Sequence, residues 1–212
     1  MAVPPPQSPP HRSDDRTALR RRLRAARREF VGSLDPESHA VATAAIDARL
    51  SPLLIRAGAT GGPIAGPIAG PIAGYVAHRS EADPLPFLIR AWQAGHDVAL
   101  PHVPAQGEEG AMIFTRWSPA TVLIPGLAGI PQPEMVEPIE PAIILAPLLG
   151  FDRAGGRLGQ GGGFYDRWFA RHPDAMRIGI AWSVQEVPAL ACAAWDVPLH
   201  AIVTETEWIV PS

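Results

Sequence analysis

A glycine-rich segment with charged residues at both ends is the stretch of the sequence best suited to chemistry. Residues 155–167 read GGRLGQGGGFYDR and contain six glycines. Glycine lets the backbone approach an anion closely because it has no Cβ, and a helix that follows presents unpaired N–H groups. Arg157 and Arg167 bracket the segment, and a guanidinium group holds phosphate oxygens through a planar fork of donors. Asp166 could hold the magnesium ion that accompanies a nucleoside triphosphate. The segment therefore predicts a phosphate-binding site.

The flanking residues predict a strand before this segment and a helix after it. The apolar run 142–149 ends at Gly150, which is typical of a buried strand in a parallel sheet, and FYDRWFARH at 164–172 has helical spacing. The segment matches neither GxxxxGK[ST] nor GxGxxG. All 18 basic residues are arginine, so no lysine exists to complete a P-loop or to form a Schiff base. For a glycine loop taken alone, a surface turn without a ligand remains the alternative.

Six short apolar or alternating runs predict the strands of one sheet. They lie near residues 72–78, 97–101, 112–117, 142–149, 177–182 and 201–206, and helical patterns separate most of them. Strands that alternate with helices indicate a three-layer α/β/α domain with a mostly parallel sheet. Helices are predicted at 16–30, from the Asp35 N-cap to about residue 56, and from Asp83 to Gly95. The last of these would turn Trp92 toward the core.

The glycine segment and the strand before it closely resemble a family signature. PLLGFD at 147–152, followed by G-x-RLG-x-GGGFYDR at 155–167, resembles the signature of the 5-formyltetrahydrofolate cyclo-ligases, also called methenyltetrahydrofolate synthetases. The resemblance runs from about Arg16 to Ile209. It implies a Rossmann-like α/β fold and an enzyme that uses ATP and Mg²⁺ to cyclise 5-formyltetrahydrofolate to 5,10-methenyltetrahydrofolate, with release of ADP and phosphate.

An amphipathic and very basic helix is predicted at residues 16–30. Apolar residues recur at helical spacing among seven arginines, at Leu19, Leu23, Ala26 and Phe30. Most of these arginines are expected to form a solvated face. The family resemblance implies that two of them, Arg16 and Arg20, contact ATP phosphates, although the family usually has lysine at the first place. Binding of RNA or of a membrane surface is the rival interpretation. The net charge of −3 and the lack of interleaved aromatic residues argue against nucleic acid.

The resemblance also assigns roles to individual residues. It implies that Arg157 and Tyr165 are the catalytic residues. Folate would contact Val76, Glu81, Trp117 and Tyr165, and Mg²⁺ would be held by Asp166 and Asp196 together with phosphate oxygens and water. ATP would be bound by Arg16, Arg20, Arg157, Leu158, Gly159, Gln160, Gly161, Gly162, Gly163, Phe164 and Tyr165. The chain departs from the family at Trp195, where histidine is usual before the aspartate, and at His200, where aspartate is usual near the last strand.

The domain prediction is a proline-rich, disordered tail at residues 1–15 and one cyclo-ligase domain at residues 16–212. Within the domain, residues 62–73 repeat the tetrapeptide GPIA three times. Prolines at every fourth position exclude a regular helix or a central strand. The repeat is therefore interpreted as a tandem insertion before a strand that begins near Ile72.

Composition narrows the setting in which the chain works. Cys192 is the only cysteine, which excludes an internal disulfide, and it is expected to be a small buried apolar residue. With no apolar run of about 18 residues and no signal-peptide pattern, we expect a cytoplasmic protein. We expect it to act as a monomer on small-molecule substrates, 5-formyltetrahydrofolate and ATP, with no nucleic acid or membrane partner. Two alternatives stay open: a relative that binds folate or nucleotide without turnover, and an RNA-associated protein that uses the arginine-rich helix.

Overall fold

A mostly parallel sheet forms the centre of the fold. The computed structural model describes residues 12–54, 70–104, 111–191, 193 and 195–211. Within these residues, seven strands form one sheet in the order β11 (Trp208–Ile209), β10 (Ala201–Val203), β9 (Met176–Ile180), β6 (Ile143–Pro147), β1 (Ile72–Ala73), β2 (Val98–His102) and β3 (Ile113–Trp117). The five inner strands run parallel, and the two edge strands, β3 and β11, are antiparallel to their neighbours.

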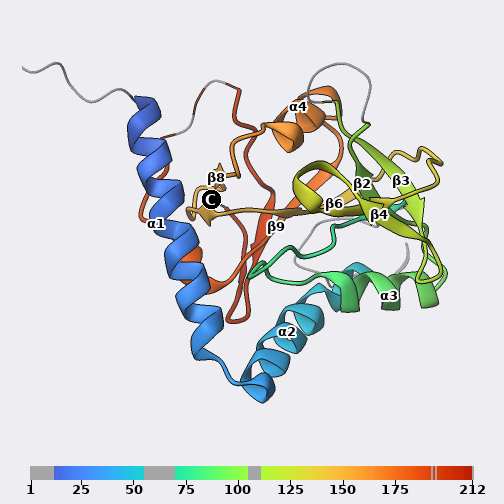
Figure 1. The fold of residues 1–212 in the computed structure, drawn as a ribbon, viewed down its shortest axis with the longest axis horizontal. Coiled ribbons are helices and arrows are strands. Elements are labelled where there is room, and N and C mark those ends of the chain that lie inside the picture. The colour runs from blue at the N-terminus through green and yellow to red at the C-terminus, as the bar shows by residue number, and fades with distance from the viewer. Residues whose placement is uncertain (1–11, 55–69, 105–110, 192, 194, 212) are drawn as a thin grey trace, which may run out of the picture.

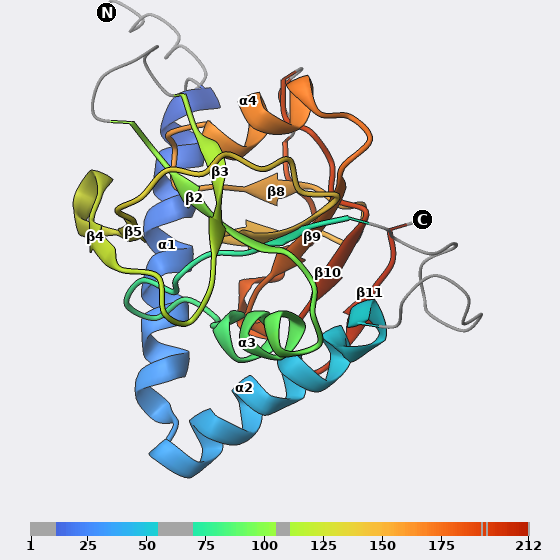
Figure 2. The same ribbon diagram turned by 90° about the vertical axis from the view of Figure 1, so that its right-hand side faces the viewer.

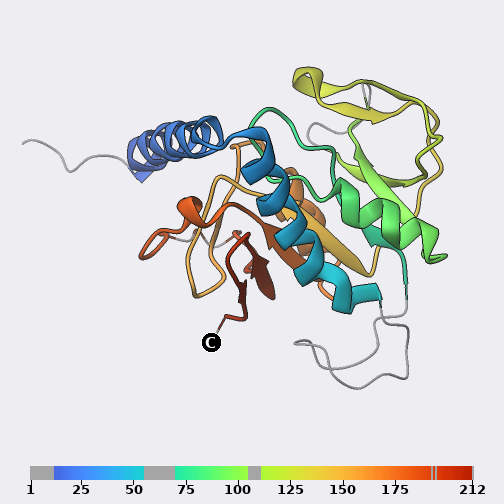
Figure 3. The same cartoon turned by 90° about the horizontal axis from the view of Figure 1, so that it is seen from below.

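Helices cover both faces of this sheet and one of its ends (Figures 1 and 2). α2 (Pro36–Leu50) and α3 (Leu85–Gln93) lie on one face, and α4 (Phe164–Arg171) lies on the other. The long helix α1 (Arg12–Ser33) stands across one end of the sheet, and the view from below separates it clearly from α2 and α3 (Figure 3). The predicted three-layer α/β/α architecture is confirmed. None of the described helices is long and apolar enough to cross a membrane.

Side chains alternate along the parallel strands, and this alternation produces the two helix layers. On β6, Ile143 and Leu145 join the core beneath α2 and α3, whereas Ile144 and Ala146 join the core beneath α4. The α4 side of the sheet carries small residues, namely Ala73, Ala99 and Ala146, and these cluster with two large aromatic side chains of α4, Trp168 and Phe169. Large and small groups are therefore matched across this layer.

The helix ends agree in part with the sequence. Asp35 caps α2 as predicted, because its carboxylate accepts a hydrogen bond from Ser38 N at 2.7 Å. α1 begins at Arg12, earlier than predicted, and α2 ends at Leu50 before a 3-10 turn, η1 (Ser51–Leu54). α3 begins at Leu85, whose N–H donates to the Asp83 carboxylate, and Gly95 follows its end with a φ of 83°. Trp92 is 45% exposed, so the prediction that it faces the core is wrong.

The first strand is shorter than the predicted segment 72–78. The ladder continues only to Gly74, whose N–H donates to the Ala99 carbonyl at 3.1 Å. A Cβ at Gly74 would lie 2.6 Å from a methyl group of Leu88, so the backbone passes close to α3 here. The chain then turns away, and the buried Tyr75 hydroxyl donates to the Ala82 carbonyl at 2.5 Å. This turn carries the following residues across the carboxyl end of the sheet. Residues 1–11 of the predicted tail, 62–69 of the repeat and Cys192 lie outside the described residues.

Candidate active site

The candidate site lies at the carboxyl ends of β1 and β6. From β1 the chain continues to β2 on one side, and from β6 it continues through α4 to β9 on the other side, so the direction of the connections reverses between these strands. Open parallel sheets bind ligands in the crevice at such a reversal. The segments that follow the two strands, residues 74–83 and 148–163, meet here, and α1 contacts both (Figure 1).

A short hairpin opens the glycine segment, formed by β7 (Gly150–Phe151) and β8 (Arg157–Leu158). Asp152 holds the turn between them. Its carboxylate accepts hydrogen bonds from the backbone N–H groups of Ala154 and Gly156, at 3.1 and 2.8 Å. A Cβ at Gly156 would lie 2.8 Å from that carboxylate, which accounts for glycine at this position. The hairpin therefore fixes the point from which the glycine loop starts.

Residues 159–163 continue from β8 to α4 as a loop. Gly161 and Gly163 have positive φ values of 116° and 64°, a backbone region that favours glycine. Gly163 is the N-cap residue of α4 and makes no side-chain capping bond, so the first turn of the helix has N–H groups available for an anion. The predicted ATP-binding residues of this segment are thus brought together around one loop.

One face of α1 supplies arginines to this loop. Arg20 Nε donates to the Gly159 carbonyl at 3.1 Å. Arg24 donates to the side-chain oxygen of Gln160 from Nε and Nη2, at 3.1 and 2.9 Å. Leu23, between the two arginines in the sequence, is buried against the hairpin. The helix is therefore docked on the loop through its apolar residues and through its guanidinium groups.

Most of the other arginines of α1 form a solvated face, as predicted, since Arg21, Arg22, Arg24 and Arg28 are exposed. Arg27 is the exception, because it is only 5% exposed. Arg24 is exposed and also binds the loop. Partial burial and the neighbouring guanidinium groups lower the pKa of Arg20, which shows that positive charge is concentrated beside the loop. Such a concentration favours a polyanionic ligand.

Arg157 and Tyr165 present polar atoms that the protein itself does not satisfy. The Arg157 side chain is buried and pairs with Asp166, with 2.6 Å between Nη2 and Oδ1. Among the described buried side-chain atoms, Arg157 Nε and Tyr165 Oη are two of four that lack a hydrogen-bond partner. Burial raises the pKa of Tyr165, so its hydroxyl stays neutral and can donate. Unpaired buried donors are rare in folded proteins, and at these two positions a ligand bound at the glycine loop would supply the missing acceptors.

Each of the two predicted metal ligands, Asp166 and Asp196, forms an ion pair with an arginine of the site. Asp196 Oδ2 is 2.8 Å from Arg16 Nη1 and also accepts a hydrogen bond from the Ala193 N–H. Desolvation alone would raise the pKa of Asp196, but these contacts outweigh it and the pKa lies below its ordinary value. Arg157 also acts electrostatically on Asp196. Both aspartates therefore present carboxylate oxygens near the Arg157 guanidinium group.

Two carboxylates suit a magnesium ion that is also bound by substrate phosphates and water. The described residues contain no group of three or more histidine, cysteine, aspartate or glutamate side chains that could hold a metal. Mg²⁺ commonly binds one or two carboxylates and takes its remaining oxygens from substrate phosphates and water. Asp166 and Asp196 could supply the two carboxylates.

Glu81 reaches the glycine loop from the β1 side of the site. Its Oε2 accepts a hydrogen bond from the His78 N–H at 3.1 Å, and its Oε1 accepts one from Gln160 Nε2 at 3.2 Å. Arg27 Nη1 lies 3.6 Å from Oε1, and Arg27 Nε donates to Ser80 Oγ at 3.2 Å. The segment around Glu81 is thus held from the backbone, from the loop and from α1. The structure brings the predicted folate ligand Glu81 into contact with the predicted ATP-binding loop.

Three other singled-out residues have different surroundings. Val76 is half-buried on the segment that leads to Glu81. Trp117 is 5% exposed and lies in the core beneath α2 and α3. It pairs with Val98 at the amino end of β2, whereas the candidate site lies at the carboxyl ends of the parallel strands. The structure therefore does not bring Trp117 to the other predicted site residues. His200 contacts Arg177 just before β10, also at the amino ends of the strands.

Comparison with known proteins shows relatives of one family. A sequence model of the 5-formyltetrahydrofolate cyclo-ligase family matches residues 12–205. The chain is 33% identical over 144 residues to the 5-formyltetrahydrofolate cyclo-ligase of Escherichia coli (strain K12), which covers 63% of this chain and 79% of that protein. It is 35% identical over 118 residues to the enzyme of the same name from Haemophilus influenzae, with 52% of this chain and 63% of that protein covered.

Solved structures show the same fold. The 5,10-methenyltetrahydrofolate synthetase of Aquifex aeolicus matches with a TM-score of 0.69 and 25% identity over 92% of both chains. The synthetase from Mycoplasma pneumoniae matches with a TM-score of 0.62 and 22% identity over 90% of this chain and 99% of that one, which supports the fold. The predicted family is confirmed, and the chain belongs to the 5-formyltetrahydrofolate cyclo-ligase family.

Proposed function

We propose that the chain catalyses the ATP- and magnesium-dependent cyclisation of 5-formyltetrahydrofolate to 5,10-methenyltetrahydrofolate, with release of ADP and phosphate. One observation carries this proposal beyond family membership: Arg157 Nε and Tyr165 Oη are buried without partners beside a glycine loop that α1 lines with arginines. Two unsatisfied donors next to an anion-binding loop suit a reaction in which charge moves between phosphate and substrate oxygens.

The reaction needs positioning more than it needs a protein nucleophile. A formyl oxygen is a poor leaving group, so the γ-phosphoryl group is first transferred to it from ATP, and ADP leaves. The neighbouring amine then attacks the formyl carbon, and the activated oxygen departs as phosphate. Phosphoryl transfer of this kind is catalysed by orientation and charge stabilisation. The absence of a Ser-His-Asp arrangement among the predicted site residues is consistent with this route.

Each site residue has a defined task in this scheme. Arg20 and the loop amides bind phosphates, and Arg157 Nε and Tyr165 Oη donate to oxygens of the two substrates at the point of transfer. Asp166 and Asp196 would hold magnesium, which neutralises phosphate charge when bound. Glu81 accepts hydrogen bonds from N–H groups of the folate, because an ionised carboxylate has acceptor sites only. Tyr165 lies in the first turn of α4, directly after the glycine loop, so it can contact both ligands.

In this proposal Val76 is a second folate contact beside Glu81. Trp117 is not a folate contact, because it pairs with the amino end of β2. Small-molecule substrates are the expected partners. The monomeric state and the cytoplasmic location stay predictions from the sequence.

The proposal is tested by incubating the purified chain with 5-formyltetrahydrofolate, ATP and magnesium. We expect 5,10-methenyltetrahydrofolate, measured by its absorbance, and ADP to form in equal amounts. Neither product should form when ATP is omitted. Folded protein that binds folate but forms no ADP would contradict catalysis and would favour a binding relative. A salt-sensitive shift of RNA that persists in Arg157→Ala, without any turnover, would favour the RNA-associated alternative.

A further inference from the structure

The side chain of Gln160 forms a bridge between the two halves of the site. Its oxygen accepts hydrogen bonds from Arg24 Nε and Nη2, at 3.1 and 2.9 Å. Its nitrogen donates to Glu81 Oε1 at 3.2 Å. A guanidinium group can only donate and an ionised carboxylate can only accept, so the two partners fix the orientation of the amide.

The chemistry of the bridge requires both a donor and an acceptor in one side chain. Glutamate at position 160 would place a second carboxylate beside Glu81, and lysine or arginine would place a second cation beside Arg24. A hydrocarbon side chain would satisfy neither partner. An amide of this length satisfies both.

The two partners of Gln160, Glu81 and Arg24, are held by other contacts, whereas Gln160 itself belongs to the glycine loop. Glu81 is held by the His78 N–H and lies near Arg27, and Arg24 also donates to the Gln160 carbonyl at 3.3 Å. Gln160 itself is exposed and lies next to Gly161, a residue with a φ of 116°. The position of the bridge therefore depends on the conformation of the glycine loop, and phosphates that bind this loop act on that conformation.

We propose that Gln160 is a positioning residue that couples nucleotide binding to folate binding. A nucleotide that holds the loop in this conformation keeps the Gln160 amide on the Glu81 carboxylate, in the orientation that accepts the folate. By thermodynamic reciprocity, bound folate increases the affinity for nucleotide by the same factor. This inference rests on the proposed function, because it takes the loop as the nucleotide site and Glu81 as a folate ligand.

The test measures the dissociation constant of 5-formyltetrahydrofolate with and without a saturating non-hydrolysable ATP analogue and magnesium. In the natural chain we expect the analogue to tighten folate binding about five- to tenfold, in the usual range for coupled sites. In Gln160→Met the factor should fall to within about twofold of one, because the bridge between the loop and Glu81 is lost. A purely structural role would weaken both measurements equally.

Two further variants sharpen the result. Gln160→Glu should weaken folate binding even without nucleotide, because two carboxylates are then adjacent. Gln93→Met changes an exposed glutamine at the end of α3 and should leave the coupling factor unchanged. Because Gln160 is exposed, Gln160→Met should keep the melting temperature within about 2 °C.

The possible failures are distinct. An unchanged coupling factor in Gln160→Met, or no coupling in the natural chain although both ligands bind, overturns the role of Gln160 and leaves the proposed function standing. If the natural chain binds neither ligand, the proposed function fails and this inference fails with it.

Discussion

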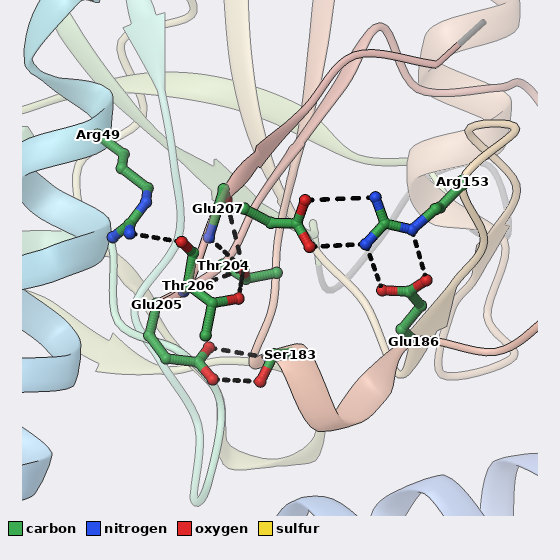
Figure 4. A network of polar contacts seen from close by, with 8 residues as sticks. All are labelled: Arg49, Arg153, Ser183, Glu186, Thr204, Glu205, Thr206 and Glu207. Carbon is green, nitrogen blue, oxygen red and sulfur yellow. Dashed lines mark hydrogen bonds and ion pairs between the residues drawn. The ribbon is translucent and has the colours of Figure 1, made fainter.

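The molecule contains two networks of charged residues that differ in how they are satisfied. At the edge of the sheet, Arg153 donates to Glu186 at 2.8 Å and to Glu207 at 2.6 Å (Figure 4). In the same network Glu205 accepts hydrogen bonds from the backbone N–H and the hydroxyl of Ser183, and Arg49 donates to the Thr206 carbonyl. All of these charged groups have partners. At the active site, by contrast, Arg157 and Tyr165 keep buried polar atoms without partners.

This difference is expected if the exposed network is structural and the Arg157 site binds ligands. Arg153 is 57% exposed, and the hydrogen bonds that it donates to Glu207 and Glu186 raise its pKa. Exposed ion pairs of this kind contribute little to stability because water competes for both charges. An unpaired buried donor destabilises the protein on its own, and at Arg157 and Tyr165 the proposed ligands would supply the missing partners. The two networks should therefore respond to mutation in opposite ways.

The largest effect is expected from Arg157. In Arg157→Ala, kcat/KM for ATP should fall about 100- to 1000-fold, whereas folate affinity should change much less, because a group that stabilises transferred charge is lost. Asp166 would also lose its partner in a partly buried site, at a cost of about 3 kcal/mol in unfolding free energy. Arg157→Lys serves as the control, since it keeps the charge near Asp166 while removing Nε. Equal losses for both substrates would mean that Arg157 supports the fold.

A smaller but more selective effect is expected from Tyr165. Tyr165→Phe should lower kcat/KM about 10- to 100-fold while leaving the melting temperature unchanged or slightly higher, because the lost hydroxyl has no partner in the free protein. The folded chain keeps the phenol proton above its ordinary pKa of 10.0, whereas the unfolded chain releases it. Stability should therefore decrease as pH rises above 10.0, and Tyr165→Phe should reduce that slope. A large drop in melting temperature at neutral pH would contradict the interpretation.

The smallest effect is expected from the exposed network. Arg153→Ala should lower the melting temperature by less than about 2 °C and leave both KM values and kcat unchanged. The stability difference should shrink further in about 1 M salt, which screens exposed charges. Calorimetry and steady-state kinetics on the same preparation check both parts. If kcat fell as strongly as in Tyr165→Phe, the two networks would not be separable in the way their contacts indicate.

The parts of the site that follow from local sequence were predicted well. The glycine segment, the strand before it and the helix after it depend on residues that are neighbours in the chain, and all three are present. The roles of Arg24, Arg27 and the Gln160 bridge depend on how α1 docks, which no local pattern contains. A signal did exist: Arg16, Arg20, Arg24 and Arg27 share one helical face with the buried Leu23.

The placement of Trp117 illustrates a second limit. Alternation along residues 112–117 predicts a half-buried strand correctly, yet it does not give the direction of that strand in the sheet. β3 runs antiparallel to β2, and this places Trp117 beside Val98 rather than beside His102. The length of β1 was overestimated for a related reason, because the approach of Gly74 to Leu88 is a tertiary contact.

The matching of alanines to aromatic side chains beneath α4 has a consequence for how this enzyme can evolve. Tyr165 belongs to the same helix as Trp168 and Phe169, so the thickness of the layer over Ala73, Ala99 and Ala146 sets the height of the Tyr165 phenol above the sheet. A valine at one of these alanines would lift the helix from beneath, without touching a ligand. Substitutions on the strands and on the helix are therefore expected to covary among relatives, as compensating pairs.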